Sequence, residues 1–482
     1  MEEYNALNWE RKREKGILPE MPDETLTTDW NRFHLDPVAY IEKNHFLEYL
    51  EPQANWTSGC PLGNGDLGTI AYGPPESSMF MLGKTDLWDY TPFGESNFFK
   101  GNFQMLRKAL AENDEEKFQQ LRAGNGKKIK HDAPTGKPGG ILRLELFPSA
   151  NLFQFQQRLS FANAEVVQRW APVGDMDRST RGEVFLTSFV QAARNVLVIH
   201  IRPERPWYEP VVFSLWHYED PGISSPEAKI EGQSGWIKQE LPGKQHFILR
   251  VGTDSDNFKL MECQGRIFAK GLPKKESLTI YVTLVTSLDT DNPLKQSQKN
   301  IEEAKKSGFE KLQKTHRKWW HSFWKKGFVS TPWKEIEKKW YYSLYLQAST
   351  SRPGRLSPGL QGNWIKEHYP AWNADFHNNI NMQVISWGQY TANRLEISEP
   401  FYRLFWKVLP QCKKDTQRFF KMRGARYPIS MGPDGCETAP GMLLATWIGA
   451  GGWLAQHYWW HYRYSGDKEF LSPVLGGRKR QL

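Results

Sequence analysis

Alternating apolar positions recur at regular intervals through the first 290 residues of the chain. In RNVLVIHIRPE (194–204), an extended backbone would place Val196, Val198 and His200 on one face and Leu197, Ile199 and Ile201 on the other. Similar runs are separated by Gly, Pro, Asp and Asn turns, and they include VVFSLWHYE (211–219), HFILRV (246–251) and LTIYVTLVTSL (278–288). Many short strands without intervening helices predict an antiparallel β-sandwich over residues 52–292, after a polar lead-in at residues 1–51.

The pattern then changes to a helical period. In WKEIEKKWYYSLYLQAST (333–350), Trp333, Ile336, Trp340 and Leu344 recur near 3.6 residues. Two more aromatic helices are predicted in residues 379–395 and 443–464, and the second should end at Gly466, which supplies a left-handed C-cap. Residues 331–482 therefore form a helical domain, and residues 293–330 form the linker to it.

The linker carries most of the net charge of +9, because eight Lys or Arg and a single acid, Glu310, lie between residues 304 and 327. The rest of the chain is nearly neutral, so we interpret this segment as an amphipathic helix with a solvated basic face. A nucleic-acid site is the less favoured alternative. Aromatic residues make up 14% of the chain and include 21 Trp. This aromatic excess fits either packing of a helical core or flat platforms for sugar rings.

The cysteines and the N-terminus limit the classes of protein further. Cys60, Cys263, Cys412 and Cys436 are far apart and form no C-x-x-C pair, so neither a metal site nor a disulfide framework is expected. The charged N-terminus has no apolar signal-peptide core, and no run reaches 18 apolar residues. We expect a cytoplasmic protein with no cofactor and no membrane or nucleic-acid partner.

The segment FHNNINMQVISW (376–387) crowds three asparagines ahead of an apolar run. If the segment is extended, His377, Asn379 and Asn381 share one face toward a cavity, while Phe376 and Ile380 anchor the other face in the core. Asn381 would also be the N-cap of the following helix. The alternative is that these side chains only bind local backbone in a loop.

Four blocks in the same order resemble glycoside hydrolase family 95, which contains α-L-fucosidases and related α-L-galactosidases. They are CPLGNGDLGTIAYG (60–73), SRPGRLSPGLQGNW (351–364), FHNNINMQ (376–383) and GGWLAQHYWWHYRYSGDKEFL (451–471). The resemblance implies a β-sandwich, a helical linker and a partial (α/α)6 barrel with six-hairpin architecture. It also implies an inverting reaction on an oligosaccharide or glycan.

The same resemblance assigns roles within the polar segment. A pair of asparagines that holds the attacking water matches Asn379 and Asn381. A substrate-contacting histidine matches His377, and a tryptophan near the sugar matches Trp447. Inversion fits such a site, since water must attack opposite the leaving group.

The chain departs from the family pattern in its carboxyl groups. The family's general acid is a glutamate in an S-P-E-N-like segment, and an aspartate orients the asparagine pair; neither has a match within these 482 residues. Ser225-Pro226-Glu227 lies among predicted strands and lacks the asparagine. Asp375 and Glu437 are the carboxylates that could contact substrate in their place, although surface or capping roles are more common for such residues. We therefore expect a chain cut short within its catalytic domain.

Three functions follow from these observations. The first is a glycosidase of the α-L-fucosidase type that is impaired or inactive as this chain. The second is a non-catalytic carbohydrate-binding remnant. A disaccharide phosphorylase is a weaker third option, because no Gly-rich or Arg-paired phosphate loop lies near the asparagines.

Overall fold

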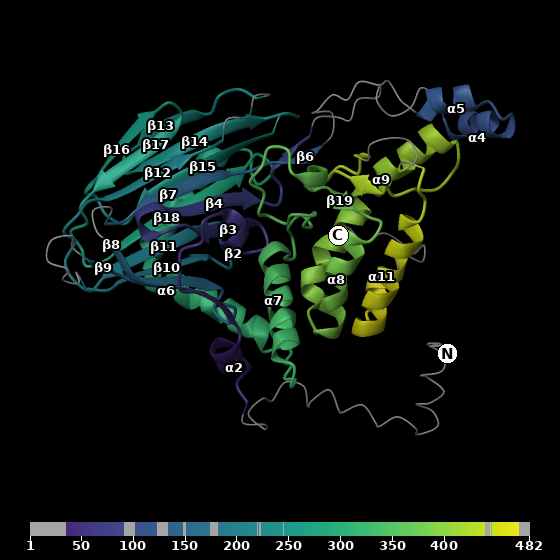
Figure 1. Ribbon diagram of the computed structural model, residues 1–482. Helices are drawn as coiled ribbons and strands as arrows, with labels where there is room; N and C mark the ends of the chain where they lie inside the picture. Colours follow the sequence, from purple (N-terminus) through teal and green to yellow (C-terminus); the bar gives the residue numbers. More distant parts are fainter. Residues whose placement is uncertain are drawn as a thin grey trace.

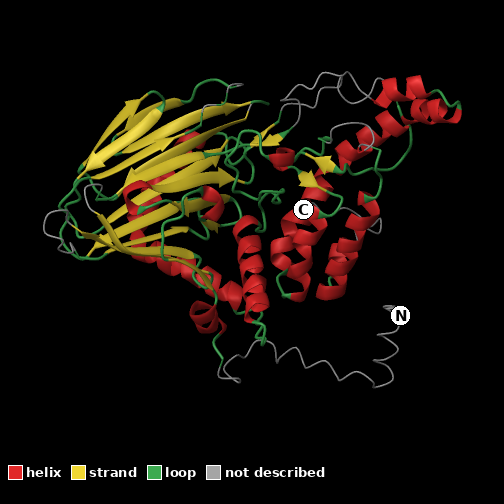
Figure 2. Ribbon diagram, viewed as in Figure 1, coloured by secondary structure: helices red, strands yellow, loops and turns green. Residues whose placement is uncertain are grey.

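A computed structural model describes residues 35–90, 102–122, 134–147, 151–173, 182–218, 220, 223–243, 245–438, 444 and 446–471. The first 34 residues of the expected lead-in and the last eleven residues of the chain lie outside this part. The described chain contains two large β-sheets on one side and a group of helices on the other (Figures 1 and 2).

The two sheets are antiparallel throughout and form the predicted β-sandwich. The nine-stranded sheet has the order β1 (Phe46–Tyr49), β8 (Asn151–Ser160), β9 (Glu165–Val173), β10 (Val184–Val190), β11 (Leu197–Pro203), β18 (Leu278–Thr286), β15 (Gln245–Thr253), β14 (Ser234–Leu241) and β13 (Glu227–Glu231). The seven-stranded sheet has the order β16 (Phe258–Cys263), β17 (Arg266–Gly271), β12 (Val211–Trp216), β7 (Gly140–Glu145), β4 (Ser78–Lys84), β3 (Leu67–Tyr72) and β2 (Cys60–Gly63). The first strand, β1, pairs with β8 and lies within the segment expected to be a polar lead-in.

Strand β11 shows how the sequence pattern builds the two faces. Leu197, Ile199 and Ile201 are buried in the core between the sheets, as the alternation predicts. Val198 points to the opposite face, where it packs against helix α6 (Pro293–Trp324). His200 lies on that same face, and its ring stacks on Phe309 with centroids 3.8 Å apart.

Helix α6 is the predicted basic connector. Asn292 caps it by accepting a hydrogen bond from the Lys295 amide at 3.0 Å, and Pro293 occupies its first turn. Its apolar side covers the nine-stranded sheet, and its exposed residues include Lys306, Lys311, Lys314 and Lys318. The amphipathic interpretation of this segment is confirmed.

Helices also interrupt the strand region, contrary to the sequence prediction. Helices α4 (Phe103–Ala111) and α5 (Glu115–Arg122) lie between β5 (Trp88–Asp89) and β6 (Thr135–Gly136). They leave the sandwich and pack on the end of helix α9 (Glu399–Phe420), where Leu106 and Leu121 contact Phe419 and Phe420. The prediction failed because the apolar partner of this pair is about 300 residues away in the sequence.

The C-terminal helices form part of an (α/α)6 barrel. They are α7 (Lys334–Thr350), α8 (Asn381–Thr391), α9 (Glu399–Phe420), α11 (Ala450–Ser465) and α12 (Lys468–Leu471). Helix α11 ends at Gly466, whose φ of 70° confirms the predicted left-handed cap. The remaining short elements are α2 (Pro37–Asn44) and the 3-10 turns Trp56–Ser58, Pro75–Ser77, Ala371–Ala374 and Leu395–Ser398.

Helix α7 joins the barrel part to the sandwich. The Tyr345 hydroxyl donates a hydrogen bond to the Pro61 carbonyl at 2.6 Å. The Asn363 amide donates to the carbonyls of Asp66 and Ser349. Gly63 lies so close to α7 that a Cβ there would be 2.3 Å from the Ser349 carbonyl oxygen. This tight contact fixes the start of the helical part against the edge of the seven-stranded sheet.

Candidate functional site

The asparagine-rich segment begins on a small two-stranded ribbon in front of helix α8. Strand β19 (Phe376–His377) pairs with β20 (Ser430–Met431), with His377 opposite Ser430. Phe376 is completely buried, stacks on Trp88 of strand β5 with centroids 5.4 Å apart, and packs in one cluster with Met431. An apolar anchor outside the two large sheets therefore fixes the position of His377.

The predicted extended strip ends at His377, and this part of the prediction is wrong. Residues 378–380 form a turn, and helix α8 begins at Asn381. The N-cap is Ile380, not Asn381, and Ile380 is 47% exposed instead of anchored in the core. The period-two argument fails because the buried residue in this stretch is Asn378.

Asn378 holds the turn through its amide groups. Its backbone N–H donates to the Ile429 carbonyl at 2.6 Å, and its side-chain Nδ2 donates to the Pro428 carbonyl at 2.8 Å. Gln383 donates from Nε2 to the Asn378 carbonyl. The alternative explanation of the asparagine cluster was binding of local backbone, but the carbonyls that Asn378 binds are about 50 residues away in the sequence.

His377 is oriented by a buried carboxylate. Its Nδ1 lies 2.9 Å from Asp375 Oδ1 and 2.9 Å from Ser430 Oγ. The second carboxylate oxygen of Asp375 accepts a hydrogen bond from the Thr438 hydroxyl at 3.0 Å. Both hydrogen-bond partners that the described residues give the ring are at Nδ1, so Nε2 is the atom that can meet a ligand on the part-exposed side.

This pair also changes the pKa of the imidazole. The hydrogen bond to Asp375 raises the pKa of His377 above its usual value, whereas burial acts in the opposite direction. A Ser–His–Asp nucleophile system needs the serine on the nitrogen opposite the aspartate. Because Ser430 shares Nδ1 with Asp375, the geometry favours a hydrogen-bonding histidine over an activated serine.

Glu437 lies across strand β20 from β19 and has an arginine partner. Met431 pairs with Phe376 on one edge and forms a β-bridge with Glu437 on the other, so β20 lies between β19 and Glu437. Glu437 Oε2 lies 2.6 Å from Arg426 Nη2, and both side chains are largely buried. Glu437 adds a favourable charge interaction to His377, but this ion pair already uses one of its oxygens.

The other predicted residues surround this centre. Asn379 lies two residues after His377, in the turn, and its buried Oδ1 has no hydrogen-bond partner among the described residues. Asn381 is exposed at the first turn of α8. Trp447 packs against the cluster that contains Phe376 and Met431. The contacts of these residues with a sugar or a water stay predictions.

Sequence reasoning missed Ser430, Thr438 and Arg426, the groups that hold His377, Asp375 and Glu437. They lie about 50 to 60 residues after the asparagine segment, so no local pattern connects them. The sequence Gly432-Pro433-Asp434-Gly435 is a recognisable turn signal, and it would have marked the hairpin that β20 begins.

Four cavities of the described part lie away from this centre. They have volumes of about 600, 460, 540 and 280 Å³, and His377, Asn379 and Asn381 line none of the four. A search of the described residues finds no group of three or more His, Cys, Asp or Glu that could hold a metal ion. In the same part of the chain, no helix has the length and apolar character needed to cross a bilayer.

The chain is similar in sequence to two known protein families. Residues 326–475 match the model of the glycosyl hydrolase family 95 catalytic domain, and residues 47–290, half of the chain, match the glycosyl hydrolase family 65 N-terminal domain. The chain is 33% identical over 152 residues to alpha-L-fucosidase 2 of Arabidopsis thaliana, and 30% identical over 143 residues to a probable alpha-fucosidase A of Aspergillus niger. These alignments cover 30% and 28% of this chain, and each covers 18% of the relative.

Solved structures agree on the architecture. A putative kojibiose phosphorylase from the human microbiome superposes with a TM-score of 0.64 at 12% identity, over 89% of this chain and 57% of that protein. At this identity the likeness concerns the fold alone, a β-sandwich followed by a helical barrel. The family models and the α-fucosidase relatives place residues 326–475 in the catalytic domain of glycoside hydrolase family 95, and half of the chain belongs to the family 65 N-terminal domain.

Proposed function

We propose that this chain binds terminal α-linked L-fucosyl or L-galactosyl residues of glycans at the β19–β20 ribbon, which carries His377, and at the turn that follows β19. The observation that supports this most directly is the Asp375–His377 pair, which holds the imidazole at the surface of the segment matching the family's catalytic domain. In this arrangement His377 Nε2 bonds a sugar hydroxyl, and Trp447 offers an apolar contact to the ring.

The ancestral reaction is hydrolysis with inversion. The Asn379 and Asn381 amide oxygens would accept hydrogens from the attacking water and fix its position. An amide cannot remove a proton, so the reaction also needs a general base and a general acid on carboxyl groups roughly 6.5–9.5 Å apart.

We propose that hydrolysis is impaired in this chain. Beside the β19–β20 ribbon, Asp375 uses both carboxylate oxygens to hold His377 and Thr438. Glu437 is paired with Arg426. A general acid must carry a proton, and an arginine partner favours the opposite state. Loss of a general acid typically lowers a rate by about 10²- to 10⁴-fold.

The second candidate is a carbohydrate-binding protein that does not hydrolyse its ligand. The same arrangement of His377 and Trp447 would bind the sugar in that case. The experiment that separates the two incubates the purified 482-residue chain with a 2′-fucosylated oligosaccharide. Fucose release and its anomer are followed by proton NMR, and binding is measured in parallel.

We expect saturable binding with very slow release of β-L-fucose, the inverted product. Binding with no release at all would favour the binding protein. Rapid release would contradict the impairment, release of the α-anomer would contradict inversion, and absence of binding would contradict both candidates.

A further inference from the structure

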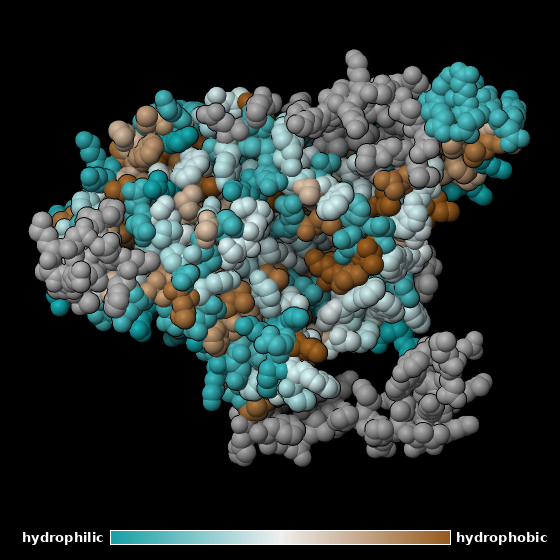
Figure 3. Space-filling view, viewed as in Figure 1, coloured by the Kyte–Doolittle hydropathy of each residue, from teal (hydrophilic) through white to brown (hydrophobic). Residues whose placement is uncertain are grey.

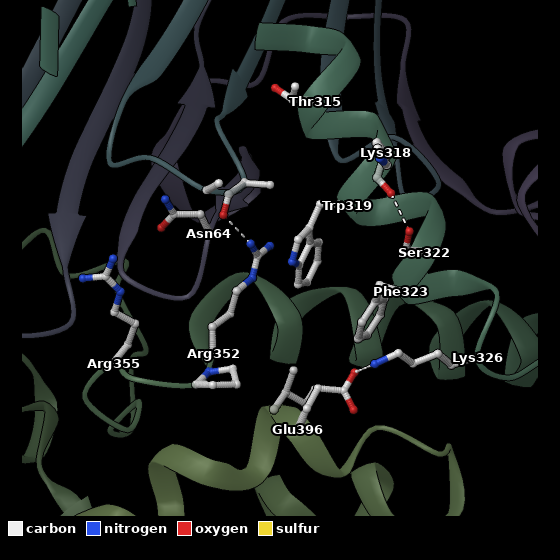
Figure 4. A pocket seen from close by; sticks show the side chains of 14 residues that line it. Asn64, Thr315, Lys318, Trp319, Ser322, Phe323, Lys326, Arg352, Arg355 and Glu396 are labelled. Carbon is white, nitrogen blue, oxygen red and sulfur yellow. Dashed lines mark hydrogen bonds and ion pairs between the residues drawn. The ribbon is translucent and has the colours of Figure 1, made fainter. Parts of the chain in front are cut away.

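The largest of the four cavities lies where the sandwich, the connector helix and the barrel part meet, away from His377. It has a volume of about 600 Å³, within the usual range for small-ligand sites. Figure 4 shows Trp319 and Lys318 of α6 on one side, Asn64 of the sandwich on another, and Arg352 between them. The third wall comes from residues 396–397, in the 3-10 turn that precedes helix α9.

The lining of this cavity is strongly positive. It carries four cationic side chains and one acid, Glu396, which is paired with Lys326. A second lining cation, Arg355, is paired with Asp66 at 3.0 Å. Arg352 and Lys318 have no carboxylate partner among the described residues, so two positive charges of the lining are left uncompensated.

Arg352 is the more unusual of the two. It is only 6% exposed, and its guanidinium lies over the Trp319 ring, 3.4 Å from the centroid. Nη1 donates to the Ala192 carbonyl at 2.7 Å and Nε to the Ala348 carbonyl at 3.0 Å. Nη2 has no hydrogen-bond partner within the described part of the chain.

Neutral carbonyls and an aromatic face orient a guanidinium but do not balance its charge. Buried arginines are ordinarily matched by a carboxylate or phosphate, because removing an unpaired ion from water is costly. Burial accordingly lowers the pKa of Arg352 from its usual value. An anion in the cavity would supply the missing partner for Arg352 and for Lys318 on the adjacent helix.

We propose that this cavity binds a sugar-sized ligand that carries an oxyanion, held by Lys318 and Arg352. Carboxylate, sulfate and phosphate share this chemistry, and the hydroxyls of Thr315 and Ser322 suit the hydroxyls of such a ligand. The cavity is separate from the β19–β20 ribbon that carries His377, and the proposal does not depend on the function proposed there.

The test measures binding of glucuronate, glucose 6-sulfate and glucose 6-phosphate by isothermal titration calorimetry, with glucose as the neutral control. At least one of the three anions should bind saturably at millimolar concentration or below, glucose should not, and added salt should weaken the binding. The anion that binds identifies the source of the oxyanion. Failure of all three anions, or equal binding of glucose, would overturn the proposal.

Variants on one helix provide the matched comparison. Lys318→Gln should weaken binding about tenfold or more, since it removes a charged hydrogen bond. Lys314→Gln removes the same charge from an exposed α6 position outside the cavity and should leave binding unchanged. Equal weakening by both variants would show general electrostatic attraction and would contradict a built site.

Arg352→Gln should abolish binding, and circular dichroism shows whether this variant is folded. If it is unfolded, the Lys318 comparison decides the question alone. If it is folded and still binds the anion as the native chain does, Arg352 is only a structural clip and the proposal fails.

Discussion

At the scale of single residues, the site depends on how one imidazole is held. Asp375 is buried, and both of its oxygens are used, one by His377 and one by Thr438. The carboxylate therefore cannot turn away from the ring without losing a second bond. This arrangement raises the pKa of His377 and fixes which nitrogen points outward.

Replacing Asp375 by Asn should lower the pKa of His377, because the charge that favours the imidazolium is removed. With the native carboxylate, the folded-state pKa lies above the unfolded value of about 6.5. The pair therefore stabilises the fold fully below that pH and loses its contribution as the pH rises through the folded pKa.

An NMR titration of the histidine rings measures this shift. Glu367→Gln is the control, because it removes one negative charge from an exposed position. A His377 pKa that is the same in the Asp375 variant as in the native chain would show that the carboxylate does not hold the ring.

Lys84 is a second residue whose environment allows a clear prediction. Its ammonium is buried between Asp66, Asp86 and Asp289, at 2.9, 2.7 and 3.1 Å. Lys84→Met would leave buried carboxylates without their cation and should lower the free energy of unfolding by about 3–5 kcal/mol.

Urea unfolding of the sandwich measures this loss. Lys108→Met provides the control, since its ion pair with Glu112 is exposed and 3.7 Å long, and it should change the free energy of unfolding by less than about 1 kcal/mol. Similar small effects in both variants would mean that the three aspartates do not depend on Lys84.

At the scale of elements, two glycines with open surroundings should respond to alanine in opposite ways. Gly308 interrupts α6 with a φ of 72°, whereas Gly452 lies inside α11 in helical backbone, and a Cβ at either position would meet nothing within 4 Å. Gly308→Ala should cost about 1–3 kcal/mol, because side chains rarely adopt that conformation. Gly452→Ala should gain about 0.5 kcal/mol, because it restricts the unfolded chain.

Thermal unfolding of the two variants provides the measurement. A stabilising Gly308→Ala change would show that α6 runs straight through this position, without the kink.

The sequence predicted elements where one periodicity extended over many residues. The alternation in β11 and the apolar side of α6 are examples, since their own residues determine which face is buried. Helices α4 and α5 were missed because they pack on Phe419 and Phe420, which no local pattern connects to them. At the site, the resemblance identified His377 and the asparagines, but the turn at 378–380 depends on carbonyls of residues 428 and 429, which the local sequence does not reveal.

At the scale of the whole molecule, the barrel part exposes an apolar face. Ile380, Val384 and Trp387 on one side of α8 are 47%, 45% and 41% exposed, and apolar side chains gather over this helix in the space-filling view (Figure 3). Trp459 of α11 is also 47% exposed. A contiguous patch of this kind promotes association.

We expect the chain to self-associate in a concentration-dependent manner through this face. Val384→Lys should weaken the association about tenfold, because it places a charge where an apolar side chain would be buried. Sedimentation velocity measures the effect. Met261→Lys, at a 56% exposed position on β16 of the sandwich, should have none, and equal weakening by both variants would place the contact elsewhere.

The central claim is that His377 and its turn form a sugar-binding surface. Its most direct test is calorimetric titration of the chain with a 2′-fucosylated oligosaccharide, compared between the native protein, His377→Ala and His246→Ala, a change on β15 of the sandwich. The geometry predicts saturable binding that the His377 variant weakens at least about tenfold, through loss of a hydrogen bond to the sugar, and that the His246 variant leaves intact. Binding that is equal in all three proteins, or absent from the native chain, would contradict it.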